Sequence, residues 1–176
     1  ANSINIVMGL PGSGKTIVAQ QYLFENASED RPAVYLSTVS EPLEKIIRYG
    51  QTLSFFDPNA IGSRVFYEDL GTSLNHQDAL TETLGRVVAT LRERRPGLLV
   101  IDSFKALHPF ASDAMAFRRF LQDLAGNLTA YPATTLWVGE YGQDEIAVAP
   151  EFAVADSVIS LAVEPTADRE TRVLQV

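Results

Sequence analysis

The 176-residue sequence predicts an α/β fold with three layers, α/β/α, around a mostly parallel central sheet. One reason is that apolar, β-rich runs alternate with segments of helical period, as in chains built from β-α-β units. Another is the continuous apolar run 98–101, which stops at Asp102 and suits a central strand buried on both faces. The length, and the absence of linkers and internal repeats, indicate a single domain over residues 1–176.

The first part of the chain predicts strands at residues 4–8, 33–37 and 64–67. A helix over residues 15–26 follows the first strand, because its apolar residues form one stripe before Arg31 and Pro32 break the chain. A second helix begins at Pro42, and its apolar positions recur at helical spacing as far as Leu53.

The second part of the chain contains the clearest amphipathic pattern. Apolar residues at steps of three and four predict a helix over residues 76–95, which Pro96 and Gly97 end. A further helix contains the apolar positions from Phe117 to Leu128. The remaining strands are expected at residues 98–101, 134–138, 158–161 and 172–176.

Charge and composition exclude several classes of protein. Lys and Arg total 14 against 22 Asp and Glu, and the net charge of -8 opposes binding to nucleic-acid phosphates and anionic membranes. The absence of Cys excludes a disulfide framework, a zinc knuckle and a thiol nucleophile. No apolar run approaches the roughly 18 residues of a membrane span, and no signal-peptide pattern opens the chain. We expect a cytoplasmic protein without a membrane segment, cut from a longer chain at both ends.

Residues 9–16 match the phosphate-binding pattern G-x-x-x-x-G-K-S/T in full. The stretch comprises Gly9, Leu10, Pro11, Gly12, Ser13, Gly14, Lys15 and Thr16. Its glycines let consecutive backbone N–H groups curl around phosphates, Lys15 reaches the β- and γ-phosphates, and the Thr16 hydroxyl binds Mg²⁺. The loop also opens a helix, whose N-terminal dipole favours anions. The motif therefore predicts binding of ATP with Mg²⁺.

Such a loop needs a carboxylate on the Mg²⁺ side, at the end of a neighbouring strand. Asp102 ends the buried run 98–101 and is our candidate. Ser103, directly after it, and Glu140, at a later strand end on the nucleotide side, are candidate sensors of the γ-phosphate. A plain strand-end acid is the alternative interpretation of Glu140.

The candidate catalytic base is Glu41. In one large class of ATPases with this loop, a Glu just past the strand that follows the first helix polarises the attacking water. Glu41 is the only carboxylate in the corresponding stretch 37–42. The alternative is a first-turn acid that complements the dipole of the helix beginning at Pro42.

The order of these elements resembles the RecA-type ATPases, and within them the KaiC-like proteins, which include the circadian clock ATPase. The resemblance covers essentially the whole chain. It depends on the residue 9–16 loop, the Glu41–Pro42 helix start, the run ending in Asp102, a Gly-Glu-Tyr strand end at 139–141, and the stretches 155–161 and 172–176.

This resemblance implies a RecA-like core that forms rings, usually hexamers, with ATP held between subunits. It also identifies departures. KaiC-like proteins usually carry two adjacent glutamates after the second strand, where this chain has Val39, Ser40 and the single displaced Glu41. The family's Lys/Arg pair, which contacts the neighbouring subunit's γ-phosphate, lies just beyond residue 176, and the family's segment ahead of the first strand is missing as well.

Other residues have simpler interpretations. Arg118 and Arg119 favour a solvated helix face over a trans-acting finger, and the three arginines at 92, 94 and 95 offset a helix dipole. Structural roles are favoured for His76 and His108, and core or interface packing for Trp137.

Three functions stay open from the sequence. The first is an ATPase, with phosphoryl transfer to protein hydroxyls as an open extension. The second is an ATP-gated module that controls an unknown protein partner, favoured by Val39 and Ser40 in place of paired acids. The third, a RecA-like DNA recombinase, is disfavoured because the loop 140–156 carries five acids and no Lys or Arg.

Overall fold

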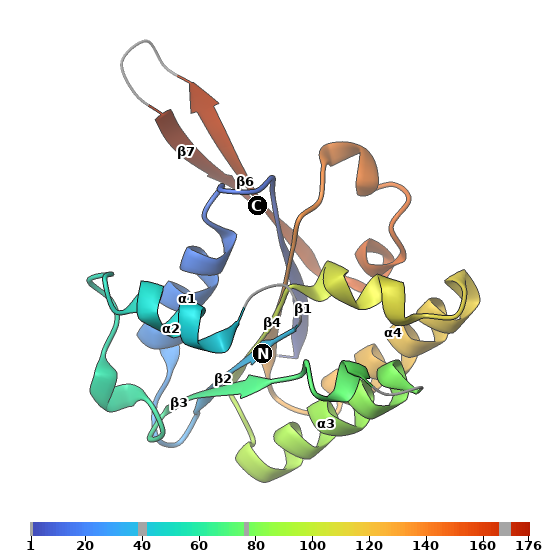
Figure 1. Ribbon diagram of the computed structural model, residues 1–176, viewed down its shortest axis with the longest axis horizontal. Coiled ribbons are helices and arrows are strands. Elements are labelled where there is room, and N and C mark those ends of the chain that lie inside the picture. Colours follow the sequence, from blue (N-terminus) through green and yellow to red (C-terminus); the bar gives the residue numbers. More distant parts are fainter. Residues whose placement is uncertain (1, 39–41, 76–77, 166–169) are drawn as a thin grey trace.

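A computed structural model describes residues 2–38, 42–75, 78–165 and 170–176. Figure 1 shows one twisted sheet with helices on both faces, and its seven strands lie in the order β3-β2-β4-β5-β1-β6-β7. The strands are β1 (Ser3–Met8), β2 (Ala33–Ser37), β3 (Val65–Asp69), β4 (Leu98–Asp102), β5 (Thr134–Gly139), β6 (Ser157–Pro165) and β7 (Glu170–Gln175). All neighbours pair in parallel except β6 and β7, which form an antiparallel hairpin. The predicted mostly parallel sheet is confirmed.

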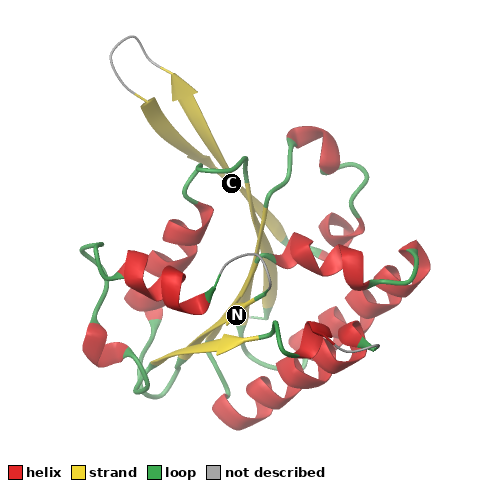
Figure 2. Ribbon diagram, viewed as in Figure 1, coloured by secondary structure: helices red, strands yellow, loops and turns green. Residues whose placement is uncertain are grey.

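The helices form the two outer layers, as Figure 2 shows by colour. They are α1 (Lys15–Asn26), α2 (Leu43–Gly50), α3 (Ala79–Arg94) and α4 (Ala114–Thr129), with short 3₁₀ helices η1 (Pro58–Ala60), η2 (Ser73–Asn75), η3 (Phe104–Phe110), η4 (Gln143–Glu145) and η5 (Pro150–Val154). One hydrophobic cluster packs α1 and α2 against one face of the sheet, and another packs α3, α4 and η3 against the other. The three-layer α/β/α prediction is therefore confirmed.

The inner strands are buried on both faces. In β4, Leu98 and Val100 face the α1 side while Leu99 and Ile101 face the α3 side, and all five residues of the strand are buried. Trp137 on β5 is fully buried and its ring stacks on that of Phe104, with centroids 4.0 Å apart, so it belongs to the core. No helix in the described ranges is long and apolar enough to span a membrane.

The strand register places the carboxyl ends of several strands, and the loops that follow them, at the same end of the sheet. Met8 of β1 pairs with Gly139 of β5, and Asp102 of β4 pairs with both Ser37 of β2 and Val138 of β5. The carboxyl ends of the parallel strands therefore lie level with one another. In open α/β sheets, ligands bind in the crevice outside this edge.

Two helix boundaries differ from the sequence-based expectation. The helix expected over residues 76–95 begins at Ala79, and residues 76–77 lie outside the described ranges. The helix from Pro42 ends at Gly50 rather than near Leu53, because the amides of Thr52 and Leu53 donate to carbonyls three residues back instead of four. A Cβ at Gly50 would lie 2.8 Å from Gln20 Oε1 and 3.0 Å from the Phe56 ring, so a larger residue there would have to displace these side chains.

Strand β3 is bound to α3 by Glu68. Its carboxylate accepts hydrogen bonds from Arg94 at 2.7 Å, Thr90 at 2.9 Å and Arg86 at 3.1 Å. Arg94 also lies over the Phe66 ring, so it does more than offset a helix dipole. Burial alone would raise the pKa of Glu68, but these hydrogen bonds and charges outweigh it and hold the pKa below its usual value.

Replacing Glu68 with Gln should lower the free energy of unfolding near pH 7 by about 1–2 kcal/mol. Because the pKa of Glu68 is lower in the folded than in the unfolded chain, its contribution is complete above the unfolded pKa and is lost as the pH falls through the folded pKa. Urea unfolding of both proteins between about pH 7 and pH 3 measures the difference. The exposed Glu93→Gln on α3 is the matched control, and a difference that stays constant into acid would contradict this account.

Candidate nucleotide site

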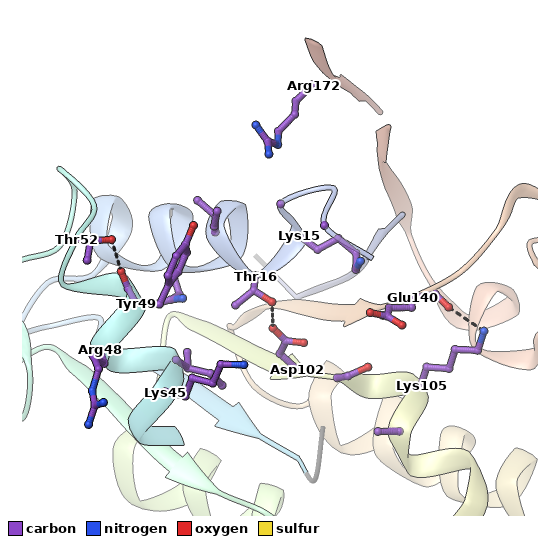
Figure 3. A pocket seen from close by; sticks show the side chains of 18 residues that line it. Lys15, Thr16, Lys45, Arg48, Tyr49, Thr52, Asp102, Lys105, Glu140 and Arg172 are labelled. Atoms are coloured by element: carbon purple, nitrogen blue, oxygen red, sulfur yellow. Dashed lines mark hydrogen bonds between the residues drawn. The ribbon is translucent and has the colours of Figure 1, made fainter. Parts of the chain in front are cut away.

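A cavity of about 1000 Å³ lies at the carboxyl-terminal edge of the sheet. Its walls come from the loop before α1, from α2, from η3, from the end of β5 and from β7 (Figure 3). The volume lies at the upper end of the range typical of small-molecule sites. The sequence-predicted residues Gly12, Gly14, Lys15, Thr16 and Asp102 all line it, as do Ser103 and Glu140.

The loop at residues 9–16 has the conformation that its glycines permit. Gly9 has a φ of 151°, and a Cβ there would collide with the carbonyl oxygen of Leu161 on β6. Gly14 has a φ of 98° and precedes α1 directly, so the first turn of that helix opens beside the cavity. Free backbone N–H groups and the dipole at such a helix start favour a bound anion.

Lys15 is largely buried in the cavity wall, with 8% of its surface exposed. Its ammonium donates a 2.9 Å hydrogen bond to the carbonyl oxygen of Leu10. Burial lowers the pKa of Lys15, and the negative charges of Glu140 and Asp102 oppose that shift. The two acids therefore help to keep a buried cation charged at the place where phosphate would bind.

Thr16 and Asp102 are in direct contact although 86 positions separate them in sequence. The Thr16 hydroxyl donates to Asp102 Oδ2 at 2.7 Å, and the hydroxyl of the buried Tyr35 donates to the same oxygen at 2.6 Å. The proton of Thr16 is thus directed at Asp102, which leaves the lone pairs of its oxygen for a cation.

These oxygens fit Mg²⁺ in a shared site. Across the described ranges, no group of three or more His, Cys, Asp or Glu residues could hold a metal by itself. Mg²⁺ commonly takes only one or two protein oxygens and completes its shell with water and substrate phosphates. Thr16 and Asp102 provide hard oxygen donors of that kind beside the phosphate-binding loop.

The backbone after Asp102 is held by Thr38. The Thr38 hydroxyl donates to the carbonyl oxygen of Ser103 at 3.1 Å and accepts from the Ser103 amide at 3.0 Å. The Thr38 amide donates to the carbonyl oxygen of Asp102 at 2.9 Å. Strand β2 therefore positions Ser103, whose Asp102–Ser103 peptide bond is cis.

Glu140 lies at the opposite side of the cavity from α2. Figure 3 shows its carboxylate directed toward Lys15 and Asp102. Its carbonyl oxygen accepts a 2.8 Å hydrogen bond from Lys105 on η3. The sequence-predicted sensor therefore faces the phosphate end of the cavity.

Sequence reasoning missed several residues of this site. Tyr35 lies inside a strand, and no pattern indicated that its hydroxyl would reach Asp102. Four other missed residues are cations that line the cavity together with Lys15, namely Lys45, Arg48, Lys105 and Arg172. Among the described residues that line the cavity, Asp102 and Glu140 are the acids, so this described part of the wall is locally basic in a chain of net charge -8.

The other residues singled out from the sequence lie elsewhere. Glu41, Val39, Ser40 and His76 fall outside the described ranges. Arg118 and Arg119 are exposed on α4 and do not line the cavity, as expected of a solvated face. His108 contacts the buried carboxylate of Glu151, which agrees with a structural role.

One comparison with known proteins bears on the whole chain. A family model described as "ATPase: KaiC" matches residues 1–176. No curated protein sequence matches the chain.

The Tyr35 hydroxyl should contribute to stability through Asp102. We expect Tyr35→Phe to lower the free energy of unfolding by about 2 kcal/mol, because a buried carboxylate loses a short charge-assisted hydrogen bond. Tyr67→Phe is the matched control, since its ring lies 5.2 Å from that of Tyr35 but its hydroxyl donates to Gln20 at 3.1 Å. That neutral bond should be worth about 1 kcal/mol. Urea denaturation measures both, and an equal or larger loss in Tyr67→Phe would contradict the assignment.

Proposed function

Because the chain belongs to the KaiC ATPase family and is a P-loop ATPase of the KaiC and RecA type, we propose that it binds Mg-ATP in the 1000 Å³ cavity and hydrolyses it. The observation that carries this proposal is the contact of Thr16 with Asp102, at the mouth of a phosphate-binding loop. Lys15 and Thr16 begin α1 and Asp102 ends β4, and these two elements converge where the triphosphate would lie.

Each residue has a distinct task in this proposal. The backbone N–H groups of residues 12–16 and the ammonium of Lys15 bind the β- and γ-phosphates. Thr16 offers its hydroxyl oxygen to the cation while Asp102 accepts its proton and orients it. Thr16 and Asp102 would hold Mg²⁺, which would supply positive charge to offset the charge that develops on the phosphates. Tyr35 holds the Asp102 carboxylate in place from inside the core.

Glu41 is our proposed general base, which takes a proton from the attacking water. It precedes α2, whose residues line the cavity. Ser103 and Glu140 are the proposed sensors at the γ-phosphate end, and the Glu140 charge also supports the charge of Lys15. Transfer of the phosphoryl group to a protein hydroxyl instead of water would give a phosphorylated protein in place of free phosphate.

We further propose that residues 1–176 form one ATPase domain of a homo-oligomeric ring, a hexamer as in the family, with ATP between subunits. Three exposed apolar residues are Leu10 on the phosphate-binding loop, Val163 on β6 and Leu174 on β7; the loop and β7 also contribute residues to the cavity wall. A neighbouring subunit that covers them would remove this apolar surface from water.

A DNA partner is not part of the proposal. The segment 140–156 contains no Lys or Arg, and its exposed acids include Glu140 and Asp144. Phosphates of DNA would meet like charge there. The ATP-gated module stays as the second candidate, because Val39 and Ser40 stand where relatives of this type carry acids.

Substitutions separate binding from hydrolysis. Lys15→Ala should weaken Mg-ATP binding at least about tenfold, because the phosphates lose their buried cation. Glu41→Gln should keep the affinity but lower the rate of phosphate release by about a hundredfold or more, because the water loses its base. Phosphate release and equilibrium binding of Mg-ATP measure these effects.

Glu44→Gln is the matched control, since Glu44 is an exposed acid in the first turn of α2. Turnover that is unchanged by Glu41→Gln would remove Glu41 from the base role. Tight ATP binding without turnover over hours in the intact protein would favour the ATP-gated module.

Assembly should depend on the exposed apolar residues Leu10, Val163 and Leu174. Leu10→Asp should weaken the ring, because it places a charge on a surface that the neighbouring subunit would cover. Val148→Asp, at an exposed apolar residue of the loop after η4, is the comparison variant. Sedimentation velocity with Mg-ATP gives the mass distribution, and a wild-type protein that stays monomeric at every concentration would contradict the ring.

A further inference from the structure

The helix η3 contacts the loop that carries Glu140 at two points. It begins one residue after Ser103, and its Lys105 and His108 are three residues apart, a spacing that places side chains on one face of a 3₁₀ helix. Lys105 contacts Glu145 of η4, and His108 contacts Glu151 of η5. We call these four residues the η3 clasp.

The first point of the clasp holds the backbone at Glu140. The Lys105 ammonium donates to the Glu140 carbonyl oxygen at 2.8 Å and to Glu145 Oε1 at 2.6 Å. The other oxygen of Glu145 accepts from the Gly142 amide at 2.9 Å, which closes the turn of η4. Lys105 also lies over the ring of Tyr141, 5.0 Å from its centroid. One cation thus joins both sides of the turn that follows β5.

The second point of the clasp is inside the core. Glu151 is fully buried, and its Oε1 contacts His108 Nε2 at 2.8 Å and accepts a hydrogen bond from the Tyr141 hydroxyl. Tyr141 folds back over Gly139, where a Cβ would collide with its ring. The residues on both sides of Glu140 are therefore anchored, Gly139 by the sheet and Tyr141 by a buried carboxylate.

Within the described ranges, the side chain of Glu140 has no comparable anchor. It is exposed in the cavity, and its carboxylate is directed toward Lys15. Its position must therefore be set by the backbone on which it stands. That backbone leaves the sheet at Gly139, and the segment after it contains only short 3₁₀ turns up to β6.

We propose that Lys105 is a positioning residue for Glu140, with the buried contact of Glu151 to His108 and Tyr141 as the fixed end of the same clasp. By bonding the Glu140 carbonyl and closing the η4 turn, Lys105 holds the Glu140 carboxylate opposite Lys15 at the phosphate end of the cavity. The inference rests on the proposed function, since it assigns Glu140 a task in ATP turnover. Small displacements of a group at a reacting centre lower rates steeply.

This role differs from that of a direct phosphate ligand, because Lys105 then acts only through Glu140. Lys105→Met should lower kcat for Mg-ATP hydrolysis about tenfold with KM changed less than about twofold, and Lys105→Arg should restore most of the rate. In a Glu140→Gln background, Lys105→Met should change kcat by less than about twofold, since the positioned group is gone. Arg118→Met, an exposed cation on α4, is the control and should leave turnover unchanged.

A second variant and a measurement that does not depend on turnover extend the test. Glu145→Gln should lower kcat in the same direction, because it removes the charged acceptor of Lys105. Backbone amides of residues 141–149 should exchange hydrogen faster in Lys105→Met than in wild type, because the η4 turn loses its tie to η3. If steady-state turnover is too slow to measure, the rate of single-turnover phosphate release with enzyme in excess replaces kcat in the same double-mutant cycle.

The outcomes distinguish the two levels of the proposal. A wild-type protein that neither binds nor hydrolyses Mg-ATP overturns the proposed function, and hydrogen exchange then still tests whether Lys105 holds the turn. Effects of Lys105→Met and Glu140→Gln that are additive in a protein that binds Mg-ATP overturn the positioning role alone and identify Lys105 as a ligand in its own right.

Discussion

The hydrogen bond from Thr16 to Asp102 is the contact on which the candidate site depends. It joins the first turn of α1 to the end of β4, although β5 lies between β1 and β4 in the sheet. The bond is possible because the parallel register brings Met8, Asp102 and the end of β5 level with one another. A side chain at Gly9 would break this arrangement, since the loop passes against the carbonyl of Leu161 on β6.

Electrostatics in this molecule are local. The net charge is -8, yet the cavity wall gathers cations from α1, α2, η3 and β7. Several acids of the C-terminal half are used inside the structure, since Glu151 is buried against His108 and Glu145 is paired with Lys105. A summed charge therefore describes solubility and long-range repulsion, whereas ligand chemistry follows from the few charges that share one edge of the sheet.

The sequence predicted the fold class and family correctly, and element boundaries less well. Alternating patterns located every strand and α-helix because burial on one or two faces repeats along the chain. The end of α2 could not be predicted in this way, because the apolar spacing continues to Leu53 while the backbone hydrogen bonds of Thr52 and Leu53 already belong to turns. The start of α3 was also predicted too early. The expected helix began at residue 76, among polar residues, whereas α3 begins at Ala79.

By itself the sequence determined the phosphate-binding loop, Asp102 as its partner acid and the strand ends where Ser103 and Glu140 stand. These features could be recognised because each depends on a short, contiguous pattern with a direct physical reason. Only the tertiary structure decided that Tyr35 supports Asp102, that Lys105 holds the backbone of Glu140, and that Glu151 is buried. Side chains that meet across tens of residues are brought together by strand order and register, which leave no mark in the local sequence.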